Sequence, residues 1–179
     1  MRGFLSQFCC SFAKTFGGCN PEPIPVIVPS LQDYINYARN EVGGLTRLQI
    51  PLNTIKAELT AVGIQPMFTA DPDDNAYCVD EDSLRRIIPF LTFPAEYYVA
   101  NLDIDCDDYA LWASAFARLL FNVNGIFQAW GQMDLGYHAF NIARVSDNKY
   151  KLFDANAGFP WAGEPFEIGG NSYRPDKFK

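Results

Sequence analysis

The chain has 179 residues, of which 49% are hydrophobic and 15% aromatic, and this composition excludes an intrinsically disordered protein. The length suits one domain that can bury a core without disulfides or metal ions as staples. A formal net charge of −7 disfavours nucleic acid as a partner, because an acidic surface repels phosphate groups. No apolar run reaches the roughly eighteen residues that a membrane-spanning helix needs, so no transmembrane segment is predicted.

Five cysteines are an odd number, and none of them shows a paired C-x-x-C spacing. The pattern therefore predicts neither a disulfide framework nor a zinc site. It favours a reducing compartment such as the cytoplasm. The cysteines are Cys9, Cys10, Cys19, Cys78 and Cys106.

The first 25 residues differ in pattern from the rest of the chain. Phenylalanine recurs every four residues from Phe4 to Phe16, which would place these rings on one face of a helix. Prolines between Pro21 and Pro29 then favour an extended connector. We expect an aromatic arm and proline-rich connector at 1–25, followed by one domain at 26–179. Residues 4–16 would either dock on that domain or contact a partner or a membrane surface.

The first half of the domain is expected to be mainly helical. Ser30 and Asp33 resemble a capping box, and the helix that they begin ends at Gly43. A second helix stops at Gly63, and a short third helix follows Asp82. The residues expected to face inward on the second and third helices are Ile55, Leu59, Val62, Leu84, Ile87 and Ile88.

Two acidic clusters offer oxygen ligands of the kind that calcium prefers. The first places three such side chains at positions one, three and five of an EF-hand-like loop, with Asp82 at position twelve. Ala76 replaces the glycine of the sharp turn, so an ordinary solvated acidic turn is an equal alternative. No cofactor is required, and calcium is the ion that these clusters suggest. The candidate ligands are Asp71, Asp73, Asn75, Asp103, Asp105 and Asp107.

Cys106 begins the most regular helical pattern in the chain. Apolar residues follow it at steps of three and four as far as Phe121, and Asp105 or Asp103 is a plausible N-cap. The helix dipole favours a thiolate at this position, whereas the neighbouring carboxylates oppose it. A reactive thiol and an inert buried core cysteine are the two alternatives.

Beyond Asn122 the pattern changes to strands, which are predicted at 125–133, 137–145 and 150–154. Helices followed by strands indicate an α+β fold. The single histidine, His138, shares a strand face with Phe140 and Ile142, and this face should be buried. His138 is therefore either a core residue or a base inside a site.

A nucleophilic thiol needs a base, and the base needs an acceptor that fixes its tautomer. Cys106 at a helix start, the stretch 136–141 entering a strand and the stretch 152–154 on the next strand offer these groups in chain order. Together they resemble the Cys-His-Asp core of papain-like and transglutaminase-like cysteine peptidases. The Asp-Cys-Asp-Asp-Tyr-Ala run is similar to bacterial and phage members of this superfamily, and to the protease-like domain of a mushroom agglutinin. The resemblance covers residues 97–156.

This resemblance implies a papain-like or transglutaminase-like α+β core, in which the cysteine helix packs on an antiparallel sheet. It implies Cys106 as the nucleophile and His138 as the general base and acid. Asp154 would orient His138, with Asn156 as its substitute.

The resemblance is incomplete at the oxyanion hole. Papain-like enzymes place a glutamine shortly before the cysteine, and residues 95–105 contain none. Asn101, Tyr98 or the backbone N–H of Cys106 would have to stabilise the oxyanion instead.

The implied activity is acyl transfer, with hydrolysis of peptide or glutamine amide bonds in a protein or peptide substrate. A transglutaminase that cross-links amines is the enzymatic alternative. A non-catalytic interaction or structural protein on the same fold is the other. The implied location is cytoplasmic, or associated with a phage or virion.

The hairpin between the second and third predicted strands decides whether Asp154 can reach His138. Side chains alternate between the faces of a sheet, so a shift of one residue turns Asp154 away. A two-residue turn at Asp147-Asn148 would lose the acid, whereas a three-residue loop would place it on the face of His138. We therefore predict an odd-length loop, or a bulge that restores the same register.

Overall fold

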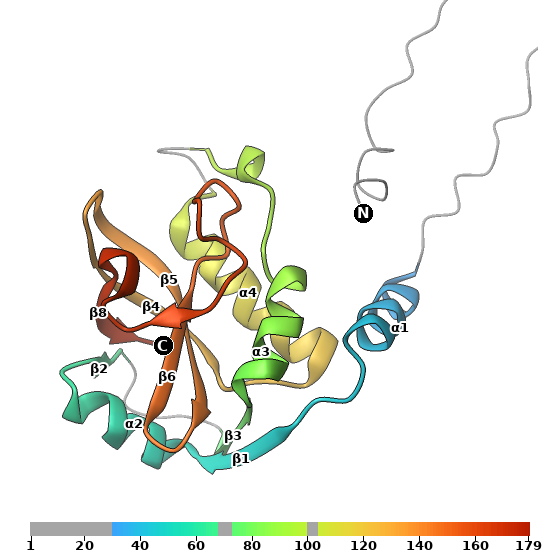
Figure 1. The fold of residues 1–179 in the computed structure, drawn as a ribbon, viewed down its shortest axis with the longest axis horizontal. Coiled ribbons are helices and arrows are strands. Elements are labelled where there is room, and N and C mark those ends of the chain that lie inside the picture. The colour runs from blue at the N-terminus through green and yellow to red at the C-terminus, as the bar shows by residue number, and fades with distance from the viewer. Residues whose placement is uncertain (1–29, 68–72, 100–103) are drawn as a thin grey trace, which may run out of the picture.

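The structure is a computed structural model that describes residues 30–67, 73–99 and 104–179 (Figure 1). The aromatic arm and its connector lie outside the described residues. Asp71, Asn101 and Asp103 also lie outside them, so the roles expected of these three residues have no structural counterpart here.

The described residues contain four α-helices: α1 (Leu31–Val42), α2 (Leu52–Ala61), α3 (Glu81–Ile87) and α4 (Cys106–Phe121). The predicted capping box is confirmed, because the Ser30 hydroxyl accepts from the Asp33 N–H and the Asp33 carboxylate accepts from the Ser30 N–H. The second helix begins after Pro51 and ends at Ala61, so Val62 is 66% exposed and does not face inward as expected. No helix in these ranges is long and apolar enough to cross a membrane.

A six-stranded sheet runs in the order β2-β8-β4-β5-β6-β7, with β2 parallel to β8 and the other neighbours antiparallel. Its three central hairpin strands match the three predicted from the sequence, and the α+β class is confirmed. The strands are β2 (Gln65–Pro66), β4 (Ile126–Met133), β5 (Gly136–Ser146), β6 (Lys149–Phe153), β7 (Phe166–Glu167) and β8 (Arg174–Phe178). A separate antiparallel pair, which the sequence did not predict, joins β1 (Arg47–Pro51) to β3 (Asn75–Val79).

Both faces of the sheet are buried. On one face α3 and α4 pack over β5 in a cluster that includes Ala143 and Val145, and α1 packs against α3 and α4 (Figure 1). On the other face residues of α2 and Tyr173, just before β8, belong to the same hydrophobic cluster as Phe140 and Ile142. His138 alternates with these two residues, so it points to the face opposite the body of α4. Cys106 can therefore meet His138 only at the end of the sheet, where α4 begins.

The β5–β6 hairpin has the two-residue turn Asp147-Asn148, so the predicted odd-length loop is wrong. Asn148 adopts a left-handed conformation with φ of 53°, which asparagine tolerates better than most residues. The alternative, a bulge, is what forms: Arg144 pairs with Tyr150 and Ser146 with Lys149, which leaves Val145 as an extra residue. The bulge restores the alternation that places Asp154 on the face of His138.

Candidate active site

The N-terminus of α4 is fixed by a reciprocal pair of side-chain caps. The Asp105 carboxylate accepts from the Asp107 N–H at 3.2 Å, and the Asp108 carboxylate accepts from the Asp105 N–H at 3.0 Å. Asp105 is therefore the N-cap, one of the two residues proposed from the sequence. Cys106 is the first helical residue and is partly exposed. This position gives the thiol access to solvent while its backbone is held rigid.

Two buried amide side chains of the sheet hold this part of α4 in place. Gln128 Nε2 of β4 donates to the Asp107 carbonyl at 2.9 Å, and Asn141 Nδ2 of β5 donates to the Ala110 carbonyl at 2.8 Å. Both residues interrupt apolar strands, which was the available sequence signal, but the sequence analysis did not identify either one. They set the position of the Cys106 helix relative to the strand that carries His138.

His138 and Asp154 form the central contact of the site. His138 Nε2 lies 2.7 Å from Asp154 Oδ2, and the two residues are 9% and 1% exposed. Because a carboxylate only accepts hydrogen bonds, the proton of this bond belongs to His138 Nε2. The other ring nitrogen, Nδ1, is then the one available to Cys106. The structure thus brings together the base and the acid expected from the sequence.

The pKa of His138 is raised from 6.5 to about 9. Burial alone would lower it, but the hydrogen bonds and negative charges of Asp154 and Cys106 outweigh burial and favour the imidazolium. The effect of Cys106 on His138 indicates that thiol and ring are close enough to interact. This arrangement favours the protonated, positively charged form of the buried His138 ring.

Asp154 is held by two further donors. The backbone N–H of Asn156 donates to Oδ1 at 2.8 Å, and the Tyr173 hydroxyl donates to Oδ2 at 2.7 Å. The Asn156 side chain does not take the orienting role expected as an alternative, because its Oδ1 accepts from the Gly158 N–H at 2.8 Å. Asn156 shapes the turn after β6, and Asp154 alone supplies the bond to His138.

Cys106 and His138 lie in one cleft of about 460 Å³. Among the described residues, its wall carries no charged side chain other than these two titratable groups, and the β4–β5 turn contributes Leu135, which is 80% exposed. The remaining lining residues are Ala95, Tyr98, Met133, Gly136, Tyr137, Asn156, Gly158 and Phe159. The cleft is therefore mainly apolar around a thiol and an imidazole, which suits an uncharged segment of substrate.

Two of the three oxyanion candidates lie in the described residues. Tyr98 lines the cleft and is partly exposed, so its hydroxyl is available to a substrate oxygen. The backbone N–H of Cys106 lies at the first position of α4, where helical N–H groups lack partners within the helix. Gln128 is a glutamine close to the cysteine helix, but its amide donates to the Asp107 carbonyl and it does not line the cleft.

The carboxylates beside the thiol form a tight acidic cluster. One ligand atom each from Asp105, Cys106 and Asp107 lies within 4.8 Å of the others. The hydrogen bond that protonated Asp107 donates to Asp105, followed by burial and the charges of Asp105 and Asp108, raises the pKa of Asp107 to about 6. Asp107 thus keeps its proton to a higher pH than an isolated carboxyl group does.

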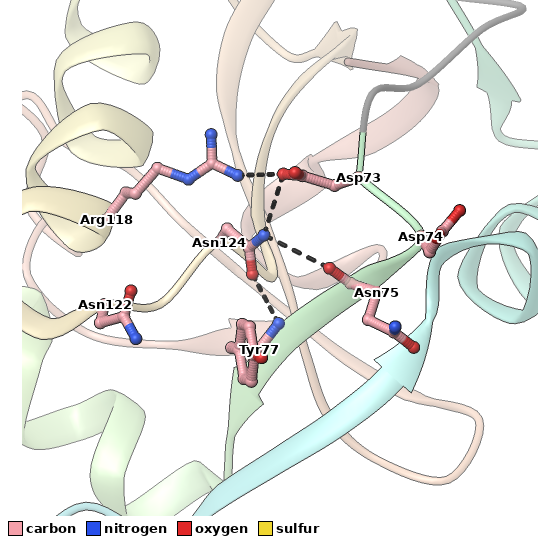
Figure 2. A pocket seen from close by; sticks show the side chains of 7 residues that line it. All are labelled: Asp73, Asp74, Asn75, Tyr77, Arg118, Asn122 and Asn124. Atoms are coloured by element: carbon pink, nitrogen blue, oxygen red, sulfur yellow. Dashed lines mark hydrogen bonds and ion pairs between the residues drawn. The ribbon is translucent and has the colours of Figure 1, made fainter.

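The first acidic segment does not have the geometry of an EF-hand loop. Asn75, expected as a ligand, begins the extended strand β3, so the following residues do not curl around a central point. The Asp73 carboxylate is paired with Arg118 and also accepts from Asn124 Nδ2 at 3.3 Å (Figure 2). These contacts join the segment to the C-terminal part of α4, whereas Cys106 begins that helix. Asp82 lies in the first turn of α3.

Comparisons with known proteins identify no family for this chain. No family model matches it, and no curated protein matches it. A solved structure described as "PSL1a-E64 complex" is 17% identical with a TM-score of 0.47, covering 73% of this chain and 51% of that chain. The chain thus spans about half the length of that structure. A similarity this weak carries no argument about fold or function.

Proposed function

We propose that this protein is a cysteine peptidase-like hydrolase with a papain-like arrangement of Cys106, His138 and Asp154. The observation that carries the proposal is the buried His138–Asp154 bond of 2.7 Å in the cleft that also contains Cys106. A histidine that only fills the core would need a hydrogen-bond partner for its ring N–H, but it would not need a thiol beside the ring. Here the ring has an acceptor on one nitrogen and a thiol within interaction range of the other.

The groups suit acyl transfer through a thioester. The Cys106 thiolate would attack the substrate carbonyl carbon and form a C–S bond, while the carbonyl electrons move to oxygen. As the C–N bond breaks, the proton on His138 Nδ1 would pass to the leaving amine. His138 would then take a proton from water, whose oxygen attacks the thioester, and C–S cleavage would regenerate the thiolate.

Asp154 has a separate task in this scheme. By accepting from Nε2, it would keep the proton on that nitrogen and direct Nδ1 towards Cys106. The backbone N–H of Cys106 and the Tyr98 hydroxyl would stabilise the negative oxygen of the tetrahedral intermediate. Because the described residues of the cleft wall carry no fixed charge besides Cys106 and His138, the expected substrate is a peptide segment with uncharged side chains at the scissile bond.

A fluorogenic peptide library tests the proposal when it is applied to the wild-type protein and to Cys106→Ser. Hydrolysis by the wild type, absent in the variant, supports the proposed chemistry. Cys78→Ser is the matched control, because Cys78 is buried and burial raises the pKa of its thiol to about 11. Equal activity of wild type and Cys106→Ser would contradict the proposal. So would incorporation of a primary amine in place of hydrolysis.

A further inference from the structure

The C-terminal part of the chain supplies a group that the triad scheme does not include. The Tyr173 hydroxyl lies 2.7 Å from Asp154 Oδ2, the same oxygen that accepts from His138 Nε2. Trp161 Nε1 lies 3.1 Å from the oxygen of that hydroxyl. We propose that Tyr173, supported by Trp161, is a positioning residue that sets the orientation of Asp154 and the strength of its bond to His138. This inference rests on the proposed function and deepens it.

The direction of both hydrogen bonds follows from which of these groups can donate and which can accept. An ionised carboxylate only accepts, so the Tyr173 hydroxyl hydrogen must point to Asp154. An indole N–H only donates, so the Tyr173 oxygen must accept from Trp161. The sequence of donors is therefore Trp161 to Tyr173 to Asp154. Successive bonds of one polarity strengthen each other, and they leave Tyr173 no alternative orientation of its hydroxyl.

Packing prevents the Tyr173 ring from moving. The residue is 0% exposed, and its ring lies edge to face against neighbours on several elements. The ring centroids are 4.8 Å from Phe140, 5.1 Å from Phe166 and 5.8 Å from His138. A hydroxyl on so constrained a ring has one position, and Asp154 must fit it.

Asp154 is consequently fixed at both oxygens. Oδ1 accepts from the Asn156 N–H, and Oδ2 is shared between His138 and Tyr173. The titratable groups that face His138 are the Asp154 carboxylate, the Cys106 thiol and the Tyr173 hydroxyl. Since Tyr173 and His138 both donate to Asp154 Oδ2, removal of the Tyr173 hydroxyl must change the bond between Asp154 and His138. A residue that only fills the core would have no such effect.

Tyr173→Phe tests this relationship because it removes the hydroxyl and keeps the ring. His138 is the only histidine of the chain, so its NMR titration has a single imidazole signal. We expect the midpoint to rise by about half a pH unit, because the carboxylate loses a competing donor and attracts the imidazolium more strongly. The titration is made in a Cys106→Ala background, which removes the titration of the neighbouring thiol.

With Cys106 intact, the same substitution should lower kcat about tenfold and leave KM unchanged, because orientation of the base matters in the transition state rather than in binding. Tyr150→Phe is the matched control. Tyr150 is also a buried tyrosine whose hydroxyl bonds a carboxylate, that of Glu58, but it lies at the other end of β6. Its substitution should move neither the His138 midpoint nor kcat.

Trp161→Phe provides a second variant that leaves the Tyr173 hydroxyl in place. It should shift the His138 midpoint in the same direction by a smaller amount. An unchanged or lowered midpoint in Tyr173→Phe would overturn the inference, and so would an equal shift in Tyr150→Phe. If Tyr173→Phe does not fold, an unchanged midpoint in Trp161→Phe overturns it instead. Failure of the proposed function is a different result: the midpoint shifts, but the wild type hydrolyses no peptide.

Discussion

His138 and Asp154 share one face of the sheet because Val145 is an extra residue in β5. Below the bulge, Asn141 pairs with Phe153, so Asp154 comes level with Phe140, two residues from His138. Without the bulge, the two-residue turn would place the carboxylate on the face of α4. The contact on which the proposed chemistry depends is thus set at the far end of the hairpin.

Asp154→Asn should test the need for this contact with little change in shape. An amide can donate as well as accept, so the ring is no longer held with its proton on Nε2. We expect kcat to fall by about 10³-fold to 10⁴-fold, as expected when the acid of such a triad becomes an amide. Steady-state kinetics with circular dichroism as the folding control would measure this. A loss below tenfold in a folded variant would argue against Asp154 as the orienting acid.

Cys106→Ser should abolish hydrolysis and leave the fold intact. The thiol is partly exposed at a helix start, so the exchange creates no sizeable cavity. Urea unfolding should give a free energy within about 1 kcal/mol of the wild type. A much larger loss of stability would indicate that Cys106 is a core residue whose main role is packing.

Removal of the thiol should also lower the pKa of His138. Burial lowers this pKa, and the bonds and charges of Asp154 and Cys106 raise it to about 9. Cys106→Ala removes one of the two groups that raise it, so the NMR midpoint should fall below that of the wild type. An unchanged midpoint would mean that the thiol and the ring do not interact.

The same pKa shift predicts how stability depends on pH. A histidine whose pKa is higher in the folded state contributes its full stabilisation below 6.5 and loses it as the pH rises towards 9. This loss should amount to at most about 3 kcal/mol between these limits. Urea unfolding at pH 6 and pH 9.5 would measure it, with His138→Gln as the variant in which this component disappears. Equal pH dependence in both proteins would contradict the raised pKa.

Asp107 should also make stability fall as the pH rises, but in a lower pH range than His138. The Asp105 bond, burial and nearby charges raise its pKa from 3.8 to about 6, so the folded state binds this proton more tightly and loses stability as pH rises through that range. Asp107→Asn should therefore gain about 1 kcal/mol relative to the wild type between pH 4 and pH 7, after allowance for solvent screening. Denaturant titrations at the two pH values would detect it. No relative gain would show that the cluster is not repulsive.

The elements that define the site could be predicted from local patterns. The Cys106 helix has a strong apolar stripe and an aspartate N-cap, and the β4, β5 and β6 strands are rich in Tyr, Phe, Ile and Val. Side-chain alternation then gives the relation between His138 and Phe140. The odd-length loop was wrong because Asp147-Asn148 forms a two-residue turn, and the compensating bulge leaves no residue signature at Val145.

Residues that act from remote parts of the chain were missed for a different reason. Strand β8 contains Pro175 and shows little alternation between apolar and polar residues, since most of its residues are polar and only Phe178 is fully buried. Nothing local indicates that Tyr173, just before it, reaches Asp154. Likewise, nothing in the sequence around Gln128 indicates that its amide bonds to α4. Such contacts depend on tertiary packing, which composition and periodicity do not encode.

The most direct measurement is the rate at which a peptide-based thiol electrophile modifies Cys106, mapped by mass spectrometry on the intact chain. We predict that Cys106 is modified far faster than buried Cys78, and that His138→Ala reduces the rate at Cys106 towards that of an ordinary thiol. Comparable rates at Cys106 and Cys78, or a Cys106 rate that does not change in His138→Ala, would contradict the central claim that these two residues form a catalytic pair.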